Sequence, residues 1–237
     1  MIYNFSLILI KVLKKIEIMN AKNIHYQNLT NEYILNQIPR EYLVSVIDSI
    51  ESAYQLAYRK INEEFEKPLA EKYYPIIRPA YIDQEIKLIT ENFETVTSTF
   101  NPNAIKNSLH AEVSSGDFVI TFSKVNHRNE IVRKAIFRET LAQDNQLGFL
   151  QLSKEEQLDD KKIYALITHV PNPLNQEKPI SINFAIPTPD CSNYVRNISL
   201  YDLTEYGSTS GSISAESDID PIEPTIITSG KTDSSDS

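Results

Sequence analysis

The strongest constraint on the fold is an apolar stripe in the first third of the chain. Between Pro39 and Pro68, apolar side chains recur every three or four residues, which places them along one side of an α-helix. Pro39 suits the first turn of such a helix, and Pro68 is expected to end it near Lys67. The stripe consists of Leu43, Val46, Ile47, Ile50, Ala53, Tyr54, Ala57, Tyr58, Ile61 and Phe65. We therefore predict a long amphipathic helix that needs another surface to cover its apolar side.

Two further patterns define the other elements. A second helix is expected over residues 81–93, after a short connector that Pro75 and Pro79 bracket. In the second half of the chain the apolar period falls to two, as in β-strands. The predicted strands cover residues 109–113, 118–125, 163–170 and 180–186.

These elements predict an α+β fold in which N-terminal helices pack on an antiparallel β-sheet. We expect one domain over residues 24–205, with a helical part at 30–95 and a sheet part at 105–205.

The two ends of the chain differ from its middle. Residues 206–237 hold six acidic side chains against one lysine, with many Ser and Thr, so we predict a disordered acidic tail. Residues 1–23 are interrupted by lysines before the roughly 20 apolar residues that a membrane span needs, so no span is expected. For this N-terminal segment three interpretations stay open: a packed first element, a membrane-surface helix, or a leader preceding a start at Met19.

Composition removes several kinds of site. Cys191 is the only cysteine, which excludes an intrachain disulfide, and no Cys/His spacing typical of structural zinc occurs. The chain has only five glycines, whereas a phosphate-cradling loop needs several close together. Of the net charge of −9, the tail supplies −5, so the rest is mildly acidic and neither excludes nor supports nucleic acid. We expect a cytoplasmic protein without cofactor or metal.

Six basic side chains crowd residues 116–141 of this acidic chain. If residues 117–125 and 130–138 form a hairpin, the bases divide between its polar face and its turn; the competing interpretation is a helix from Glu130 to Gln143. The density of β-branched residues favours the strand. The six are Lys124, His127, Arg128, Arg133, Lys134 and Arg138. Acidic side chains lie among them, so a structural or solubilising role is favoured over contact with phosphates.

Few residues are candidates for catalysis. His169 ends a predicted strand, and Asp190 and Cys191 follow the next strand; a nucleophile pair needs its base within hydrogen-bond reach. In a hairpin the end of one strand meets the start of the next, so His169 and Cys191 are expected at opposite edges and the pair is disfavoured. A metal-dependent nuclease would use Asp117 and Lys124, but the acid expected two residues before Lys124 is missing.

The order of sequence segments carries a resemblance. GDFVITFSKV is followed by a segment of the form FR-x-x-LA-x-x-NQ that starts at Phe137, then by IYALITHVP with its late histidine, and finally by NISLYDL. In this order the chain resembles a family of uncharacterised bacterial proteins over about three quarters of its length. The resemblance implies no activity and no site residue. The closing phrase suggests a terminal strand or turn from which Leu200 and Leu203 pack inward.

The sequence favours a non-catalytic intracellular interaction protein with an unknown protein partner, of a kind accessory to a bacterial defence, regulatory or mobile-element system. An enzyme is the less favoured class. The alternative is a nucleic-acid-associated protein or degenerate nuclease that uses the surface around Lys134. The residues of that surface are Lys124, Arg128, Arg133, Lys134 and Arg138.

Overall fold

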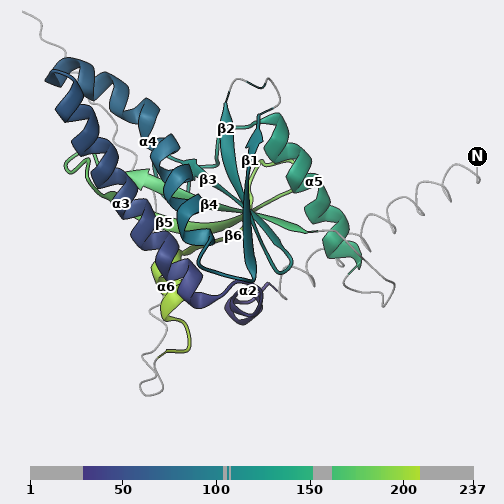
Figure 1. Ribbon diagram of the computed structural model, residues 1–237. Helices are drawn as coiled ribbons and strands as arrows, with labels where there is room; N and C mark the ends of the chain where they lie inside the picture. Colours follow the sequence, from purple (N-terminus) through teal and green to yellow (C-terminus); the bar gives the residue numbers. More distant parts are fainter. Residues whose placement is uncertain (1–28, 104–105, 107, 152–161, 209–237) are drawn as a thin grey trace, which may run out of the picture. The chain divides into compact units, whose positions relative to one another are not determined.

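The computed structural model describes residues 29–103, 106, 108–151 and 162–208 (Figure 1). The expectations for residues 1–23 and for the tail beyond Ser208 lie outside these residues. In chain order the elements are α2 (Asn31–Gln37), α3 (Arg40–Glu64), α4 (Lys67–Thr90), β1 (Val96–Pro102), β2 (Leu109–Ser115), β3 (Phe118–Lys124), α5 (Ile136–Gln151), β4 (Ile163–Pro171), β5 (Pro179–Pro187), β6 (Tyr194–Ser199) and α6 (Leu200–Glu205).

A six-stranded sheet organises the described part of the chain. Its strands lie in sequence order, and each neighbouring pair is antiparallel except β3 and β4, which run parallel. A parallel pair requires a crossover connection, and α5 lies within it. Helices α3 and α4 pack together on one side of the sheet, and α5 lies apart from them (Figure 1). The predicted α+β fold, with N-terminal helices on a mostly antiparallel sheet, is confirmed.

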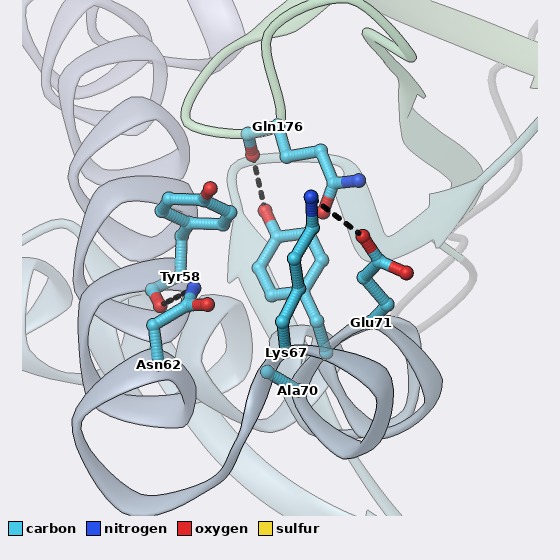
Figure 2. A pocket seen from close by; sticks show the side chains of 7 residues that line it. Tyr58, Asn62, Lys67, Ala70, Glu71 and Gln176 are labelled. Atoms are coloured by element: carbon cyan, nitrogen blue, oxygen red, sulfur yellow. Dashed lines mark hydrogen bonds and ion pairs between the residues drawn. The ribbon is translucent and has the colours of Figure 1, made fainter.

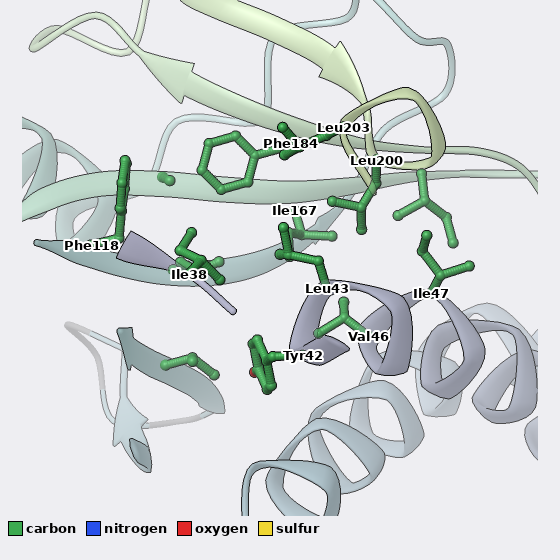
Figure 3. Close-up of a cluster of buried hydrophobic side chains, with 14 of the residues drawn as sticks. Ile38, Tyr42, Leu43, Val46, Ile47, Phe118, Ile167, Phe184, Leu200 and Leu203 are labelled. Atoms are coloured by element: carbon green, nitrogen blue, oxygen red, sulfur yellow. The ribbon is translucent and has the colours of Figure 1, made fainter. Parts of the chain in front are cut away.

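The first half of the predicted stripe is buried in the core between α3 and the sheet, whereas Ala57 and Ile61 pack against α4, and Phe65, just past the helix, is 42% exposed. Leu43 and Val46 are fully buried and belong to one cluster with Phe118 of β3, Ile167 of β4 and Phe184 of β5 (Figure 3). Burying an aliphatic side chain of this size contributes roughly 1.5–3 kcal/mol. The contact between α3 and strands β3, β4 and β5 therefore contributes substantially to the stability of the fold.

The last described helix closes the same core. Leu200 and Leu203 of α6 are fully buried beside α3 (Figure 3), which confirms that this end of the domain packs inward. Ser199 caps the helix by accepting a hydrogen bond from the backbone N–H of Asp202. Within the described residues, no helix combines the length and the apolar composition that crossing a membrane requires.

Helix α4 corrects the prediction of a connector between two helices. Pro75 and Pro79 both lie inside one continuous helix, and Pro68 lies in its first turn. An internal proline lacks an N–H and crowds the preceding turn, which usually breaks or kinks a helix. Both internal prolines are exposed. On the solvent side of a helix, water can bond to the carbonyl groups that a proline leaves without a partner.

The predicted hairpin after β3 is wrong. Residues 126–135 form an irregular loop, and α5 begins at Ile136. The competing interpretation, a helix starting at Glu130, identified the right kind of element but placed its start six residues early. The reason lies in the tertiary structure, because the second face of the sheet is apolar around Tyr164 and Leu166 and needs to be covered. The free energy gained by covering this face outweighs the strand propensity of residues 130–138.

Replacing Leu43 with alanine is expected to lower the free energy of unfolding by about 2–5 kcal/mol, because the missing side-chain atoms leave an empty space in the centre of the core. Val44, the next residue, is 42% exposed. Val44→Ala is therefore expected to change the free energy of unfolding by about 0.5 kcal/mol or less. Urea denaturation followed by circular dichroism measures both variants, and equal losses would contradict the described orientation of α3.

Candidate functional site

A cavity lies at the free end of the hairpin formed by α3 and α4. Its volume is about 300 Å³, and the loop between β4 and β5 completes its wall (Figure 2). The lining residues are Tyr58, Asn62, Lys67, Ala70, Glu71, Tyr74 and Gln176. A more open groove of about 440 Å³ shares Tyr58 and Asn62 with the cavity and extends over the other side of α3.

The walls of the cavity are held by hydrogen bonds and ring packing. The Tyr58 and Tyr74 rings meet edge to face, with centroids 5.7 Å apart. The Tyr74 hydroxyl donates to the backbone carbonyl of Gln176, which fixes the β4–β5 loop against α4 (Figure 2). The Asn62 amide donates to the backbone carbonyl of Tyr58 at 2.7 Å. The small side chain of Ala70, which is itself buried, leaves the space between these walls.

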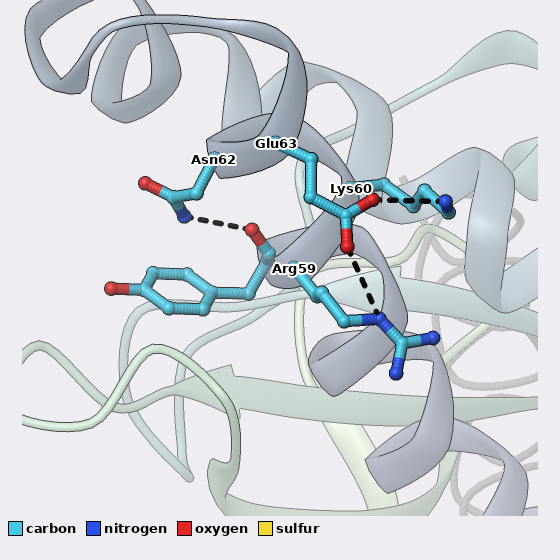
Figure 4. A network of polar contacts seen from close by, with 5 residues as sticks. Arg59, Lys60, Asn62 and Glu63 are labelled. Atoms are coloured by element: carbon cyan, nitrogen blue, oxygen red, sulfur yellow. Dashed lines mark hydrogen bonds and ion pairs between the residues drawn. The ribbon is translucent and has the colours of Figure 1, made fainter.

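Opposite charges around the cavity neutralise each other. Glu63 forms ion pairs with Lys60 at 2.9 Å and with Arg59 at 3.9 Å (Figure 4), and Lys67 lies 3.9 Å from Glu71. The hydrogen bond between Lys60 and Glu63 raises the pKa of the lysine and lowers that of the glutamate. These pairs are exposed and add little stability. Their consequence is electrostatic: the three bases and two acids offset most of each other's charge, so these pairs leave little net charge for an ionic partner.

Apolar side chains are also exposed at this end of the hairpin. Leu69, Tyr73 and Ile76 recur at helical spacing in α4, Phe65 lies in the turn before that helix, and Ile76 is 64% exposed. We call these four residues the hairpin stripe. The rings of Phe65 and Tyr73 pack together with centroids 5.6 Å apart. Leu174, in the loop that closes the cavity, is 96% exposed. The hairpin end therefore combines a cavity with apolar surface.

A buried group of polar and aromatic side chains connects the hairpin to the sheet. His169 of β4 is fully enclosed, and its Nδ1 lies 2.7 Å from the hydroxyl of Tyr54 in a shared hydrogen bond. Arg78 is also buried, and its guanidinium packs over the rings of Tyr54 and Tyr74 at 4.5 and 5.0 Å. Burial, together with the positive charges of Arg78 and Lys124, lowers the pKa of His169 to about 3. The imidazole is therefore neutral at physiological pH.

The structure does not bring His169 and Cys191 together. His169 pairs with Ile182 near the start of β5, whereas Cys191 follows the end of that strand, so most of the length of β5 separates them. Burial raises the pKa of the Cys191 thiol, which keeps it protonated. Asp190 accepts hydrogen bonds from the hydroxyls of Thr188 and Ser192, which lower its pKa to about 2. Asp190 and Cys191 thus lie in a tight turn, not in a site with His169.

The five predicted nucleic-acid contacts divide into two groups. Four are exposed at the end of β3 or in the loop before α5: Lys124, Arg128, Arg133 and Lys134. Arg138 is partly buried and donates to the Ser123 hydroxyl at 3.1 Å and to the Arg133 carbonyl at 2.9 Å, so it holds the loop in place.

The residues of the nuclease hypothesis also lie apart. Asp117 precedes β3 and accepts a hydrogen bond from the Tyr33 hydroxyl at 2.8 Å, whereas Lys124 is the last residue of that strand. A seven-residue strand spans roughly 23 Å. Within the described ranges, no three His, Cys, Asp or Glu side chains are grouped in a way that could hold a metal ion.

Sequence reasoning missed the cavity and the hairpin stripe. The stripe had a detectable pattern, because Leu69, Tyr73 and Ile76 repeat at helical spacing, but the neighbouring prolines argued against a helix there. The cavity had no such pattern. Its wall includes Gln176, about a hundred residues away from Tyr74 in the chain.

Comparison of this chain with protein-family models, with curated proteins and with solved structures found no match.

The lowered pKa of His169 predicts a pH-dependent stability. Below the unfolded-state pKa of 6.5, the unfolded chain binds a proton that the folded chain does not, so stability falls as the pH decreases from about 6.5 toward 3. Between pH 7 and pH 5 this single group should lower the free energy of unfolding by about 2 kcal/mol.

The variant His169→Gln tests this, because it retains a polar partner for Tyr54 and removes the titration. Urea titrations at both pH values should show a smaller loss for the variant; equal losses in the two proteins would contradict a neutral, buried histidine.

Proposed function

We propose that this chain is a non-catalytic interaction protein that binds a segment of a partner protein at the free end of the α3/α4 hairpin. The observation that carries the proposal is the hairpin stripe, whose exposed apolar side chains occur at the same end of the hairpin as a preformed cavity, on another side of α4. Exposed apolar surface bordered by polar groups is typical of protein contact sites. The same surface would be costly to keep in water without such a role.

The charges and the shape of the site favour an apolar anchor. The bases and acids around the cavity are paired with each other, so a partner gains little from carrying net charge. A cavity of about 300 Å³ is at the lower limit of ligand pockets, which range from about 300 to 1,000 Å³. Such a space suits one aromatic or large aliphatic side chain of a bound peptide, packed on the Tyr58 and Tyr74 rings.

Two further properties of the site support binding without chemistry. The cavity walls are fixed by the Tyr74 and Asn62 hydrogen bonds, so little ordering is needed when a partner binds. The candidate base and nucleophile, His169 and Cys191, are both buried and do not line the cavity. We also propose a cytoplasmic location, which a single buried cysteine suits, and a role accessory to a bacterial defence, regulatory or mobile-element system.

A library of random twelve-residue peptides displayed on phage, selected against the full chain, tests the proposal. Enriched peptides are expected to share an aromatic or large aliphatic residue, and their affinity is then measured for variants. Ala70→Phe fills the cavity, and Ile76→Asp places a charge in the hairpin stripe. Each is expected to weaken binding at least tenfold, about 1.4 kcal/mol.

Leu88→Asp is the matched control, because Leu88 is an exposed leucine of α4 outside the hairpin stripe. It is expected to leave peptide affinity within twofold, and circular dichroism confirms that all three variants remain folded. The proposal fails if no peptide is enriched, or if the enriched peptides bind Ala70→Phe and Ile76→Asp as tightly as they bind the unmodified chain.

A further inference from the structure

The chain between β3 and α5 forms a fixed loop despite having no regular secondary structure. We call residues 125–134, together with Lys124 at the end of β3, the basic loop. Its backbone is pinned by side chains of β6: the Asn197 amide donates to the carbonyl of Arg128 at 3.0 Å, and the Tyr194 hydroxyl donates to the carbonyl of Glu130 at 3.0 Å. The same hydroxyl accepts from the N–H of Val132 at 3.1 Å. The loop is therefore held against the sheet at successive points.

Apolar anchors hold the basic loop as well. Val125 and Val132 are buried in the cluster that covers the second face of the sheet. Near the start of the loop, the carboxylate of Glu130 accepts hydrogen bonds from the side-chain amide and the backbone N–H of Asn126. Val125 and Val132 are thus turned inward, and the exposed side chains of the loop are mainly basic, although the carboxylate of Glu130 also remains accessible to solvent.

Four of these bases lack a counter-charge. Lys124, Arg128, Arg133 and Lys134 are exposed, and none forms an ion pair with a residue that the structure describes. The helical layer differs, because four of its bases are each paired with a glutamate three or four residues along the helix: Arg59, Lys60, Lys67 and Lys87. The basic loop therefore concentrates positive charge in a chain of net charge −9.

We propose that the basic loop binds the phosphate backbone of nucleic acid. Phosphodiesters are regularly spaced anions that lysine and arginine contact without regard to base sequence. The fixed conformation of the loop suits such a regular array. A membrane surface usually requires an amphipathic helix with an apolar face, and among the residues whose side chains are described, Ile136 is the one exposed large apolar side chain near the loop. This proposal concerns a different surface from the hairpin end and does not depend on peptide binding there.

The expected binding is weak, sequence-independent and sensitive to salt. Contacts limited to phosphates give dissociation constants of about 10⁻⁴ to 10⁻⁶ M at physiological salt. If four phosphates are neutralised, the logarithm of the affinity falls with the logarithm of the salt concentration with a slope of about −3 to −4. Between 50 and 200 mM KCl, the dissociation constant should then rise by about a hundredfold.

Fluorescence anisotropy with the full chain and a labelled 20-base-pair DNA duplex tests this. The double variant Arg133→Glu/Lys134→Glu is expected to bind at least tenfold more weakly, with a salt slope reduced in size by about 2. Arg59→Glu/Lys72→Glu makes the same change in net charge at exposed helical positions. This control should retain its affinity within twofold, and it separates a local contact from an effect of overall charge.

Three outcomes would overturn the proposal. One is the absence of duplex, single-stranded DNA or RNA binding at 50 mM KCl. Another is an equal loss of affinity in the two double variants. The third is an affinity for polyglutamate or for phosphatidylserine vesicles that equals or exceeds the affinity for the duplex. Either result would identify a general affinity for polyanions. None of these results bears on the peptide selection at the hairpin end.

Discussion

The burial of one side of α3 against β3, β4 and β5 is the interaction on which the rest of the structure depends. Helix α3 has 25 residues and is therefore about 37 Å long, whereas the nine residues of β4 span roughly 30 Å. The second half of α3 consequently packs on α4 in a cluster of its own, which contains Ala57, Ile61, Ala70 and Tyr74. The cavity forms beside this second contact, because the side chain of Ala70 is a single methyl group and leaves space next to the Tyr58 and Tyr74 rings.

The second face of the sheet is covered in a different way. Helix α5 covers part of it, and Asn145 fills the place where β4 and β5 separate: its amide donates to the carbonyls of Tyr164 and Pro187, and its oxygen accepts from the N–H of Tyr164. Arg138 fixes the preceding loop through Ser123. Both residues belong to the FR-x-x-LA-x-x-NQ segment, so two of its polar positions have structural roles. A short sequence pattern can therefore indicate the connection between β3 and β4 and the residues that hold it in place, without indicating a catalytic site.

The elements that could be predicted from the sequence are those whose burial follows a simple period. The stripe from Leu43 to Phe65 predicted α3 because that helix has one clearly buried side. Strand β6 was not identified as a definite strand because all six of its side chains are only partly buried, and α4 was divided because its exposed prolines resemble a helix end. The cavity could not be predicted at all. It depends on which side chain is small at a helix contact and on a loop brought there by the register of β4 and β5.

His169 lies between the two surfaces for which we propose partners. Its backbone carbonyl accepts from the N–H of Val125, where the basic loop begins, and its ring shares a hydrogen bond with Tyr54, one helical turn before Tyr58 of the cavity wall. A residue in this position could transmit a change only if it had two stable arrangements. The ring is instead neutral, completely enclosed and fixed at both ends. The connection therefore acts as a rigid support, and we expect the hairpin end and the basic loop to bind their partners independently.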